Sequence, residues 1–203
     1  MPPFAVRTHF ATNRILWSRI ILCVTVVIAI ASSRPHYLNS WLQDLVELTG
    51  YALLVVAACW RVWCISFIGG AKDNQLAISG PYSIVRNPLY LGSFLGIIGF
   101  GLAVGLPGLA GTLALLFGAL YPAVVALEEA YLLNRFGLDY VLYCKKVPRW
   151  IPHWSKYSEP ATILVSPQKL RQGILDSMWY LWAFAFAEVL EMLRDHQVLR
   201  GFF

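Results

Sequence analysis

An arginine, an asparagine and two tyrosines stand within residues 80–92, directly in front of a long apolar segment. Asn87 and Pro88 form a typical helix start, because asparagine can cap free backbone N–H groups and proline suits the first helical position. The amino terminus of a helix has unpaired donors and a partial positive charge, so it can bind a carboxylate or a phosphate. Arg86 adds a fixed fork of donors beside it. The stretch therefore predicts an anion-binding site at the mouth of a membrane helix.

A second polar cluster lies at the far end of the next apolar segment. Glu128, Tyr131 and Arg135 follow one another at intervals of three and four residues, so they share one face of a helix. A carboxylate on that face could receive an ammonium group. The alternative is a solvated helix end in which Glu128 and Arg135 balance each other. The adjacent Glu129 weakens that alternative, because only one of two neighbouring glutamates can easily face water.

Composition indicates the class of protein. Hydrophobic residues make up 58% of the 203 residues, charged residues make up 13%, and the mean hydropathy is +0.60. A soluble domain is nearer a quarter charged, so we expect a single all-α membrane domain over residues 1–203. The formal charge is +5, but the basic residues are scattered between apolar segments, which fits loops against an anionic leaflet. Membrane lipids are therefore expected as neighbours, and nucleic acid is not expected as a partner.

No metal site is expected from the cysteines or the histidines. The cysteines lack the spacing of metal ligands, and a thiol in an apolar segment behaves as a small hydrophobe. The histidines are isolated and flank apolar segments. The residues in question are Cys23, Cys59, Cys64, Cys144, His9, His36, His153 and His196.

Four apolar segments approach the roughly 20 residues that a helix needs to cross the hydrocarbon core. They cover about 15–31, 46–68, 89–106 and 109–127. Only Leu106-Pro107-Gly108 separates the third from the fourth, which predicts a tight antiparallel helical hairpin. The third segment also carries Gly92, Gly96 and Gly99 on one side, where another helix or a ligand could approach closely.

Two further segments admit two interpretations each. The first segment, with Ala29-Ile30-Ala31 at its end, resembles a cleavable signal peptide. We favour an uncleaved helix, because the later segments need its surface to pack against. Residues 172–193 hold an aromatic run with acidic interruptions, and they fit either a fifth span or an interfacial helix. The sequence therefore predicts four to five transmembrane helices.

Lysine and arginine counts in the connections predict the orientation. The flank before the first segment and the connections after the second and fourth are basic, whereas those after the first and third are nearly bare. The protein is therefore expected to be a multi-pass membrane protein whose amino terminus and both polar clusters face the cytoplasm.

The order of these motifs resembles the integral-membrane methyltransferases, which include isoprenylcysteine carboxyl methyltransferase and the phospholipid N-methyltransferases. The resemblance covers about residues 74–152. Its motifs are Gly-Pro-Tyr at 80–82, Val-Arg-Asn-Pro-Leu-Tyr-x-Gly at 85–92, Glu-Glu-x-x-Leu at 128–132, Phe-Gly-x-x-Tyr-x-x-Tyr at 136–143 and Val-Pro-Arg at 147–149. It implies two amino-terminal helices over 1–68, a catalytic core over 69–152 and a carboxy-terminal extension over 153–203.

The resemblance also implies a cofactor, S-adenosylmethionine, held on the cytoplasmic side between the hairpin helices and the following loop. The residues that would border it are Asn74, Gln75, Leu76, Ala77, Tyr82, Asn87, Pro88, Leu89 and Tyr90, with Glu128 reaching its methionine or ribose portion. Two positions depart from the family. Asn87 stands where histidine is common, and Val124 stands where eukaryotic prenylcysteine enzymes have a substrate-binding arginine.

Methyl transfer from a sulfonium needs donor and acceptor held in line, without a metal or a covalent enzyme intermediate. A carboxylate acceptor needs no base, whereas an amine acceptor must lose a proton. Because histidine is absent from the motifs, we expect a carboxylate on a lipophilic or lipidated acceptor, steered by Arg86 or Arg135. The alternatives are an amine acceptor, as in phospholipid N-methylation, and a non-catalytic membrane subunit that kept the fold.

Two other classes fit less well. A transporter should hold its sites near the membrane midplane on broken helices, whereas both polar clusters here lie at one edge. A soluble nucleotide-binding methyltransferase is excluded, because the chain has no glycine fingerprint between a strand and a helix.

Overall fold

The computed structural model describes residues 39–69, 75–163 and 165–195. Every regular element in these ranges is a helix and none is a strand, which confirms the expected all-α class. The elements are α2 (Ser40–Gly69), α3 (Pro81–Ile84), α4 (Pro88–Ala103), α5 (Pro107–Phe136), α6 (Leu138–Lys146), the 3₁₀ helix η1 (Trp154–Lys156) and α7 (Pro167–Asp195). The predicted first helix at 15–31, with its signal-peptide alternative, lies outside the described residues.

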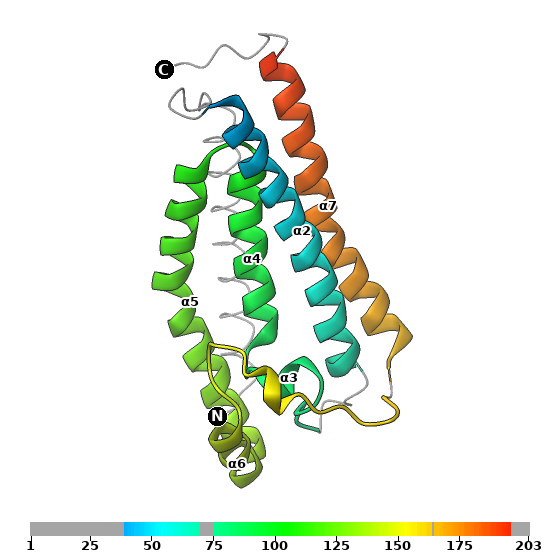
Figure 1. The fold of residues 1–203 in the computed structure, drawn as a ribbon. Coiled ribbons are helices and arrows are strands. Elements are labelled where there is room, and N and C mark those ends of the chain that lie inside the picture. The colour runs from blue at the N-terminus through cyan, green and yellow to red at the C-terminus, as the bar shows by residue number, and fades with distance from the viewer. Residues whose placement is uncertain (1–38, 70–74, 164, 196–203) are drawn as a thin grey trace, which may run out of the picture.

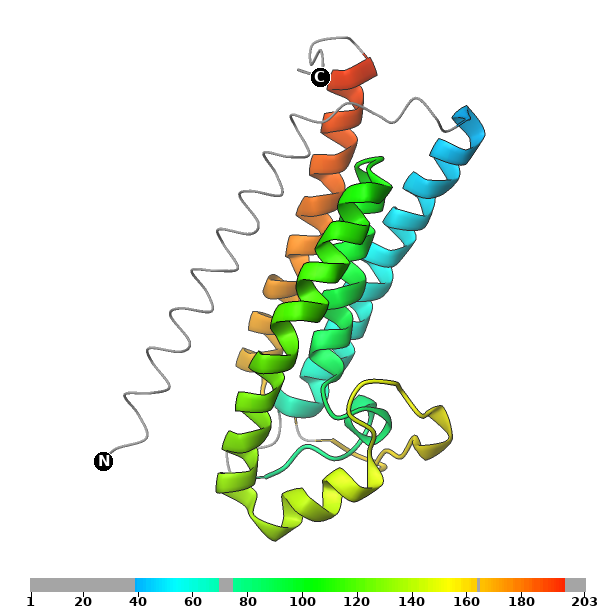
Figure 2. The ribbon, with the colours of Figure 1, turned by 90° about the vertical axis from the view of Figure 1, so that its left-hand side faces the viewer.

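Four long helices run side by side and form a bundle (Figures 1 and 2). The chain descends α2, rises along α4, descends α5 and rises again along α7. The connections from α2 to α4 and from α5 to α7 therefore meet at the same end of the bundle. The turn between α4 and α5 lies at the opposite end and confirms the predicted hairpin.

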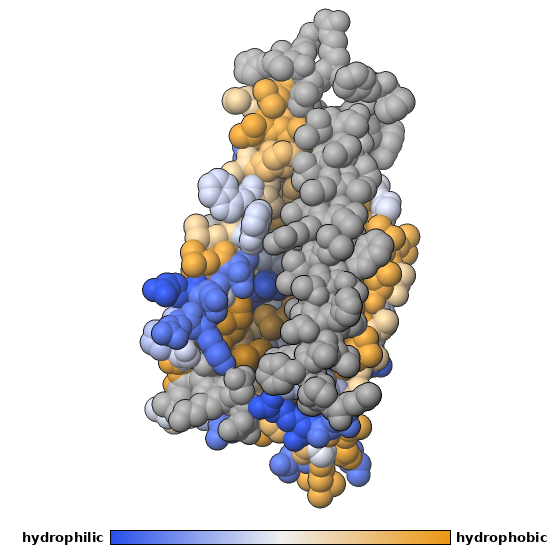
Figure 3. Space-filling view, turned by 180° about the vertical axis from the view of Figure 1, so that it is seen from behind, coloured by the Kyte–Doolittle hydropathy of each residue, from blue (hydrophilic) through white to orange (hydrophobic). Residues whose placement is uncertain are grey.

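Three of these helices are long and apolar enough to cross a membrane, namely α2 over Ser40–Ile68, α5, and α7 over Pro167–Leu190. Helix α4 has 16 residues and ends at Ala103, short of the predicted 106. Its end is set by Gly105, whose φ of +75° starts the turn toward α5. On the coloured part of the face in Figure 3, apolar side chains extend along the bundle and hydrophilic ones gather in the lower half.

The glycines of α4 form a helix-packing surface. A Cβ atom added to Gly99 would lie 3.0 Å from the carbonyl oxygen of Gly50, and one added to Gly50 would lie 2.2 Å from the backbone nitrogen of Ala103. Backbones this close leave no room for side chains, so α2 and α4 contact each other directly. Of the two roles expected for the α4 glycines, close approach of another helix is confirmed.

Helix α7 belongs to the bundle and does not lie across its end (Figure 1). The ring of Phe184 lies 4.6 Å from that of Tyr51 on α2, and the ring of Phe186 stacks at 6.2 Å on Phe100 of α4. A Cβ added to Gly173 would lie 2.5 Å from Ile65 on α2. The span interpretation of residues 172–193 is therefore the one that the structure supports.

Candidate functional site

The base of the site is made by two segments that lie far apart in the sequence. Backbone hydrogen bonds join them: Gly80 donates to Ser158 at 2.8 Å, Arg86 to Pro148 at 2.9 Å, and His153 to Ile84 at 2.9 Å. Gly80 has a φ of +59°, and a Cβ there would lie 2.4 Å from the ring of Phe67. The loop after α6 thus holds α3 in place beneath the helices.

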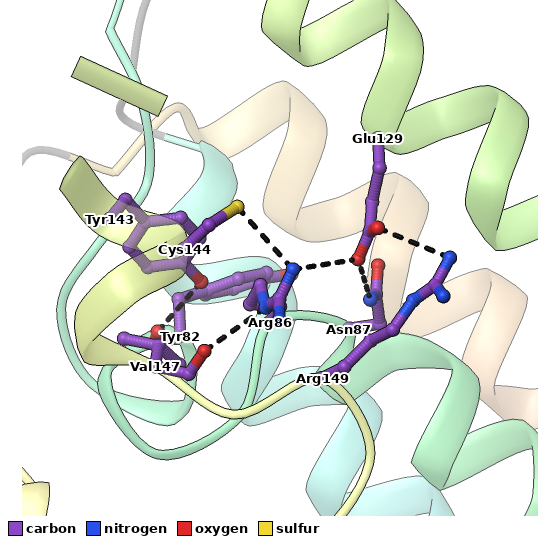
Figure 4. A network of polar contacts seen from close by, with 8 residues as sticks. All are labelled: Tyr82, Arg86, Asn87, Glu129, Tyr143, Cys144, Val147 and Arg149. Carbon is purple, nitrogen blue, oxygen red and sulfur yellow. Dashed lines mark hydrogen bonds and ion pairs between the residues drawn. The ribbon is translucent and has the colours of Figure 1, made fainter. Parts of the chain in front are cut away.

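A cluster around Glu129 ties this base to α5 (Figure 4). We define the Glu129 cluster as Arg86, Asn87, Glu129 and Arg149. The Oε1 atom of Glu129 lies 3.5 Å from Nη1 of Arg86 and 3.2 Å from Nδ2 of Asn87. The Oε2 atom of Glu129 lies 3.2 Å from Nη2 of Arg149. The Glu129 side chain is only 15% exposed. One half-buried carboxylate therefore joins α5 to the start of α4 and to the loop after α6.

Asn87 does not do what its sequence position predicts. It precedes α4 as the N-cap residue, but its side chain makes no capping hydrogen bond and donates to Glu129 instead. Its backbone oxygen accepts from the N–H groups of Tyr90 and Leu91. The predicted helix start at Pro88 is confirmed, whereas the predicted side-chain cap is wrong, because the charge-assisted bond from Nδ2 to Glu129 orients the Asn87 amide toward α5.

Arg86 is held by more than its ion pair. Its Nε donates to the carbonyl of Val147 at 3.0 Å, and Nη1 also approaches Sγ of Cys144 at 3.4 Å. These contacts fix the direction of the guanidinium. Arg86 therefore helps to hold the base of the site together, and it also lines the cavity above that base.

A cavity of about 510 Å³ opens above this base. Every expected site residue that the structure describes lines it; Asn74 lies outside the described residues. The predicted lining residues are Gln75, Leu76, Ala77, Tyr82, Arg86, Asn87, Pro88, Leu89, Tyr90, Glu128 and Arg135. The sequence motifs thus converge on one space, to which α4, α5 and the segment before α3 all contribute.

The predicted face of α5 is turned toward the cavity. The carboxylate of Glu128 accepts a hydrogen bond from the hydroxyl of Tyr90 at 2.6 Å, across the hairpin. Arg135 donates to the hydroxyl of Tyr131 at 2.8 Å, one turn earlier. All four side chains line the cavity. The alternative interpretation had Glu128 and Arg135 balancing each other directly, whereas in the structure each contacts a tyrosine.

Two buried tyrosines form part of the cavity wall. Tyr143 donates to the backbone oxygen of Tyr82 at 2.8 Å. The Tyr82 hydroxyl is buried and has no hydrogen-bond partner within the described part of the chain. Burial raises the pKa of both phenols above the ordinary value of 10.0. Both tyrosines therefore stay neutral, and the donor of the Tyr82 hydroxyl is unused in the described part of the chain.

Several lining residues are absent from the sequence prediction. They are Arg61, Ile68, Ser93, Tyr121, Leu132 and Lys169. Leu132 belongs to the Glu-Glu-x-x-Leu motif, whereas no motif marks the other five. Arg61, Ile68 and Lys169 are brought to the cavity by the packing of α2 and α7. Of these five, Arg61 alone carries a signal in the sequence, because it is a charged residue inside the apolar segment 46–68. Val124 is half-buried and is not among the residues that line the cavity.

Comparison with known proteins agrees with the motifs. Residues 46–139 match the phospholipid methyltransferase family. The chain is 31% identical to the cobalt-zinc-cadmium resistance protein CzcN of Cupriavidus metallidurans, over 92% of this chain and 85% of that protein. It is 30% identical to the nickel-cobalt-cadmium resistance protein NccN of Alcaligenes xylosoxydans xylosoxydans, over 98% of this chain and 93% of that protein.

A shorter match is to an enzyme of the family that the motifs resemble. Over 83 residues the chain is 37% identical to the protein-S-isoprenylcysteine O-methyltransferase of Schizosaccharomyces pombe, which is 40% of this chain and 34% of that protein. No solved structure matches the chain. The agreement of motif order, helical hairpin and relatives leads to one conclusion: this chain belongs to the family of integral-membrane methyltransferases that includes the phospholipid and isoprenylcysteine methyltransferases.

Proposed function

We propose that this protein uses S-adenosylmethionine to methylate a carboxylate on a lipophilic acceptor. One observation carries the proposal: all the described residues that the family resemblance assigns to the cofactor line a single cavity. Its volume of about 510 Å³ lies within the usual range of roughly 300–1,000 Å³ for small-molecule sites.

The chemistry of the lining fits the cofactor. Glu128 offers a carboxylate to its ammonium or ribose hydroxyl groups, and the hydroxyl of Tyr90 orients that carboxylate. Tyr82 offers a buried hydroxyl donor without a partner in the described residues. Leu76 and Leu89 add apolar surface to the same wall. A mixed wall of this kind suits a ligand that has charged, polar and apolar portions.

When bound, S-adenosylmethionine supplies an electrophilic methyl group, which a carboxylate oxygen takes up with its own electron pair. The residues of this chain therefore have no proton to remove. No histidine is among the lining residues that the structure describes, and the carboxylate of Glu128 already accepts from Tyr90. We propose that Arg86 and Arg135 orient the acceptor. Positioning of this kind can supply a large share of a rate enhancement.

The end of the bundle that holds the cavity is proposed to face the cytoplasm. Lysine and arginine concentrate in the connections at that end, including Lys145, Lys146 and Arg149, whereas the α4–α5 turn has none. Basic connections are retained on the cytoplasmic side during insertion. A cytoplasmic cavity would also have access to soluble S-adenosylmethionine.

The first test is calorimetric titration of detergent-purified protein with S-adenosylmethionine. Micromolar binding, about −8 kcal/mol, is expected for the wild type, and Glu128→Ala and Tyr90→Ala should weaken it. Glu188→Gln is the control, because Glu188 is an exposed glutamate on α7 that does not line the cavity. Absence of binding by folded wild type would overturn the proposal and favour the non-catalytic subunit.

Acceptor screening then separates the two kinds of methyl transfer. Prenylcysteines present a carboxylate, and phosphatidylethanolamine presents an amine. Methylation of the first supports the proposal, whereas methylation of the second alone would replace it with N-methylation, the alternative that the family also contains.

We also propose that this methyl transfer serves metal resistance. The support is the identity with CzcN and NccN, two resistance proteins that match nearly the whole chain. The test is growth of a Cupriavidus metallidurans strain that lacks CzcN on cobalt, zinc and cadmium. The wild-type chain should restore growth and Glu128→Ala should not. Equal restoration of growth by the wild-type chain and by Glu128→Ala would show that resistance does not depend on methyl transfer.

A further inference from the structure

Arg61 is a charged residue within a helix that is apolar enough to span a membrane. It lies in α2, eight residues before the last residue, Gly69, which is roughly 12 Å along the helix axis. Its side chain lines the cavity. A charge at such a depth is costly unless it has a partner, and it usually marks a functional site.

The contacts of Arg61 use only part of its guanidinium. Nη1 donates to the hydroxyl of Ser93 at 3.0 Å, and the group lies 6.0 Å from the centre of the Tyr180 ring. Its Nε is buried and has no hydrogen-bond partner within residues 39–69, 75–163 and 165–195. Over the same residues no carboxylate forms an ion pair with Arg61, whereas Arg86 pairs with Glu129. Arg61 is thus a cation whose anion is missing from the described part of the protein.

The neighbouring helices make room for this arginine. A Cβ atom added to Gly92 would lie 3.1 Å from Cγ of Arg61 and 2.8 Å from Cδ1 of Trp60. One added to Gly96 would lie 1.9 Å from the Tyr180 ring. Trp60 is itself fixed, because its indole N–H donates to the carbonyl of Pro88 at 2.7 Å. The Arg61 side chain thus passes beside Gly92 and near the Tyr180 ring to line the cavity.

The charges of the cavity wall favour a negatively charged ligand. Arg61, Arg86, Arg135 and Lys169 line it beside one carboxylate of the described residues, Glu128, and of these cations Arg135 and Lys169 already have partners of their own. The charge of Arg86 is already paired with Glu129, which does not line the cavity. The Glu128 carboxylate is assigned to the cofactor. An acceptor that brings an oxyanion to Arg61 would therefore pair with a guanidinium that has no carboxylate partner in the described residues.

We propose that Arg61 binds the oxyanion of the lipophilic acceptor, with Ser93 and Tyr180 holding the guanidinium in position. This inference rests on the proposed function, because it takes the bound lipid to be the methyl acceptor. The binding of a lipidic oxyanion can nevertheless be measured without methyl transfer. The oxyanion is either a carboxylate or a phosphodiester. Arg61 is therefore inferred to be a residue that determines specificity for the acceptor and has no part in holding the cofactor.

The experiment measures equilibrium binding of acceptor lipids to the full-length protein in maltoside micelles, which contain no phosphate. The ligands are N-acetyl-S-farnesylcysteine, its neutral methyl ester and phosphatidylethanolamine. The wild type should bind one of the two oxyanion ligands roughly 10- to 100-fold more tightly than the ester. Tighter binding of farnesylcysteine identifies a carboxylate, and tighter binding of phosphatidylethanolamine identifies a phosphodiester. Equal binding of all three ligands would overturn the proposal.

The variants assign the preference to the arginine. Arg61→Met should abolish the preference for the oxyanion, Arg61→Lys should keep part of it, and Ser93→Ala should weaken it. Arg171→Met is the matched control, because Arg171 is an exposed arginine on α7 outside the cavity lining, and it should leave the preference unchanged. A preference that survives in Arg61→Met would refute the inference.

Cofactor titration keeps the two proposals apart. Arg61→Met should bind S-adenosylmethionine within about twofold of the wild type, since Arg61 is not assigned to the cofactor. An equal loss of cofactor and oxyanion binding would place Arg61 at the cofactor and contradict the inference. Failure of the wild type to bind S-adenosylmethionine would contradict the proposed function, while the lipid titrations would still decide the role of Arg61.

Discussion

The hydroxyl of Tyr90 lies 2.6 Å from Oε2 of Glu128. Tyr90 is in the first turn of α4, and Glu128 is in the last third of α5. The contact therefore crosses the hairpin at the end where the chain motifs meet, opposite the α4–α5 turn. A tyrosine that donates to a carboxylate fixes the direction in which the remaining carboxylate oxygen can accept. This pair is the natural starting point for tests of the cavity.

A double-mutant cycle should show that Tyr90 and Glu128 act together on the cofactor. Tyr90→Phe and Glu128→Gln are each expected to weaken S-adenosylmethionine binding about tenfold, or 1.4 kcal/mol. The double variant should lose less than the sum, because residues in one hydrogen-bonded unit are not additive. Calorimetry measures all four proteins. Strict additivity would mean that the contact does not serve the cofactor.

Glu129 should act on stability, in contrast to its neighbour Glu128. Glu129→Gln removes the negative charge that holds Arg86 and Arg149, so the free energy of unfolding should fall by about 1–3 kcal/mol. Thermal unfolding in detergent measures the loss. Glu128→Gln is the matched control in the adjacent position, and its midpoint should change little. An unfolding midpoint that moves equally in both variants would contradict the division of roles.

Gly96→Ala should separate α7 from α4. The added Cβ would lie 1.9 Å from the Tyr180 ring, and overpacking of this kind costs about 1–3 kcal/mol. Gly118→Ala is the control, because no atom lies within 4 Å of a Cβ there and alanine favours a helix by roughly 0.5–1 kcal/mol. A second change, Tyr180→Ala, should recover part of the stability lost in Gly96→Ala. The thermal unfolding midpoints of the wild type, Gly96→Ala, Gly118→Ala and the Gly96→Ala/Tyr180→Ala double variant measure these effects. No recovery in the double variant would contradict the role of the Tyr180 ring.

The buried tyrosines predict a loss of stability in alkali. Burial raises the pKa of Tyr82 and Tyr143 above 10.0, so the unfolded chain loses these protons first as the pH rises. The contribution is complete below about pH 10 and declines above it, since the unfolded state then binds fewer protons than the folded one. Tyr143→Phe should make the decline shallower. A decline of unchanged slope between pH 9 and 11 would exclude Tyr143 as its source.

Cysteine labelling should report the orientation. In a background without native cysteines, Ser155→Cys lies in the loop at the cavity end, and Gly108→Cys lies at the start of α5 by the hairpin turn. With the cavity end in the cytoplasm, a membrane-impermeant maleimide should label position 108 in intact cells. Position 155 should be labelled only after the membrane is opened. The reverse pattern would invert the proposed topology.

Much of the architecture could be predicted from neighbouring residues. The apolar segments predict the bundle helices, and Leu106-Pro107-Gly108 predicts the hairpin, because helix length and turn chemistry depend on local composition. Helical spacing alone placed Glu128, Tyr131 and Arg135 on one face, and the structure turns that face toward the cavity. The order of the motifs predicted that the remaining site residues share one site. They lie in consecutive segments around the α4–α5 hairpin.

Tertiary packing alone decided the rest. The pairing of Asn87 with Glu129 joins residues 42 positions apart, and it prevailed over the local preference of asparagine for capping. The places of Arg61 and Lys169 in the cavity wall depend on how α2 and α7 pack beside α4. Neither spacing nor propensity encodes such contacts. They arise because glycines on α4 let bulky side chains from both neighbouring helices approach its backbone, and that close approach exists only in the folded bundle.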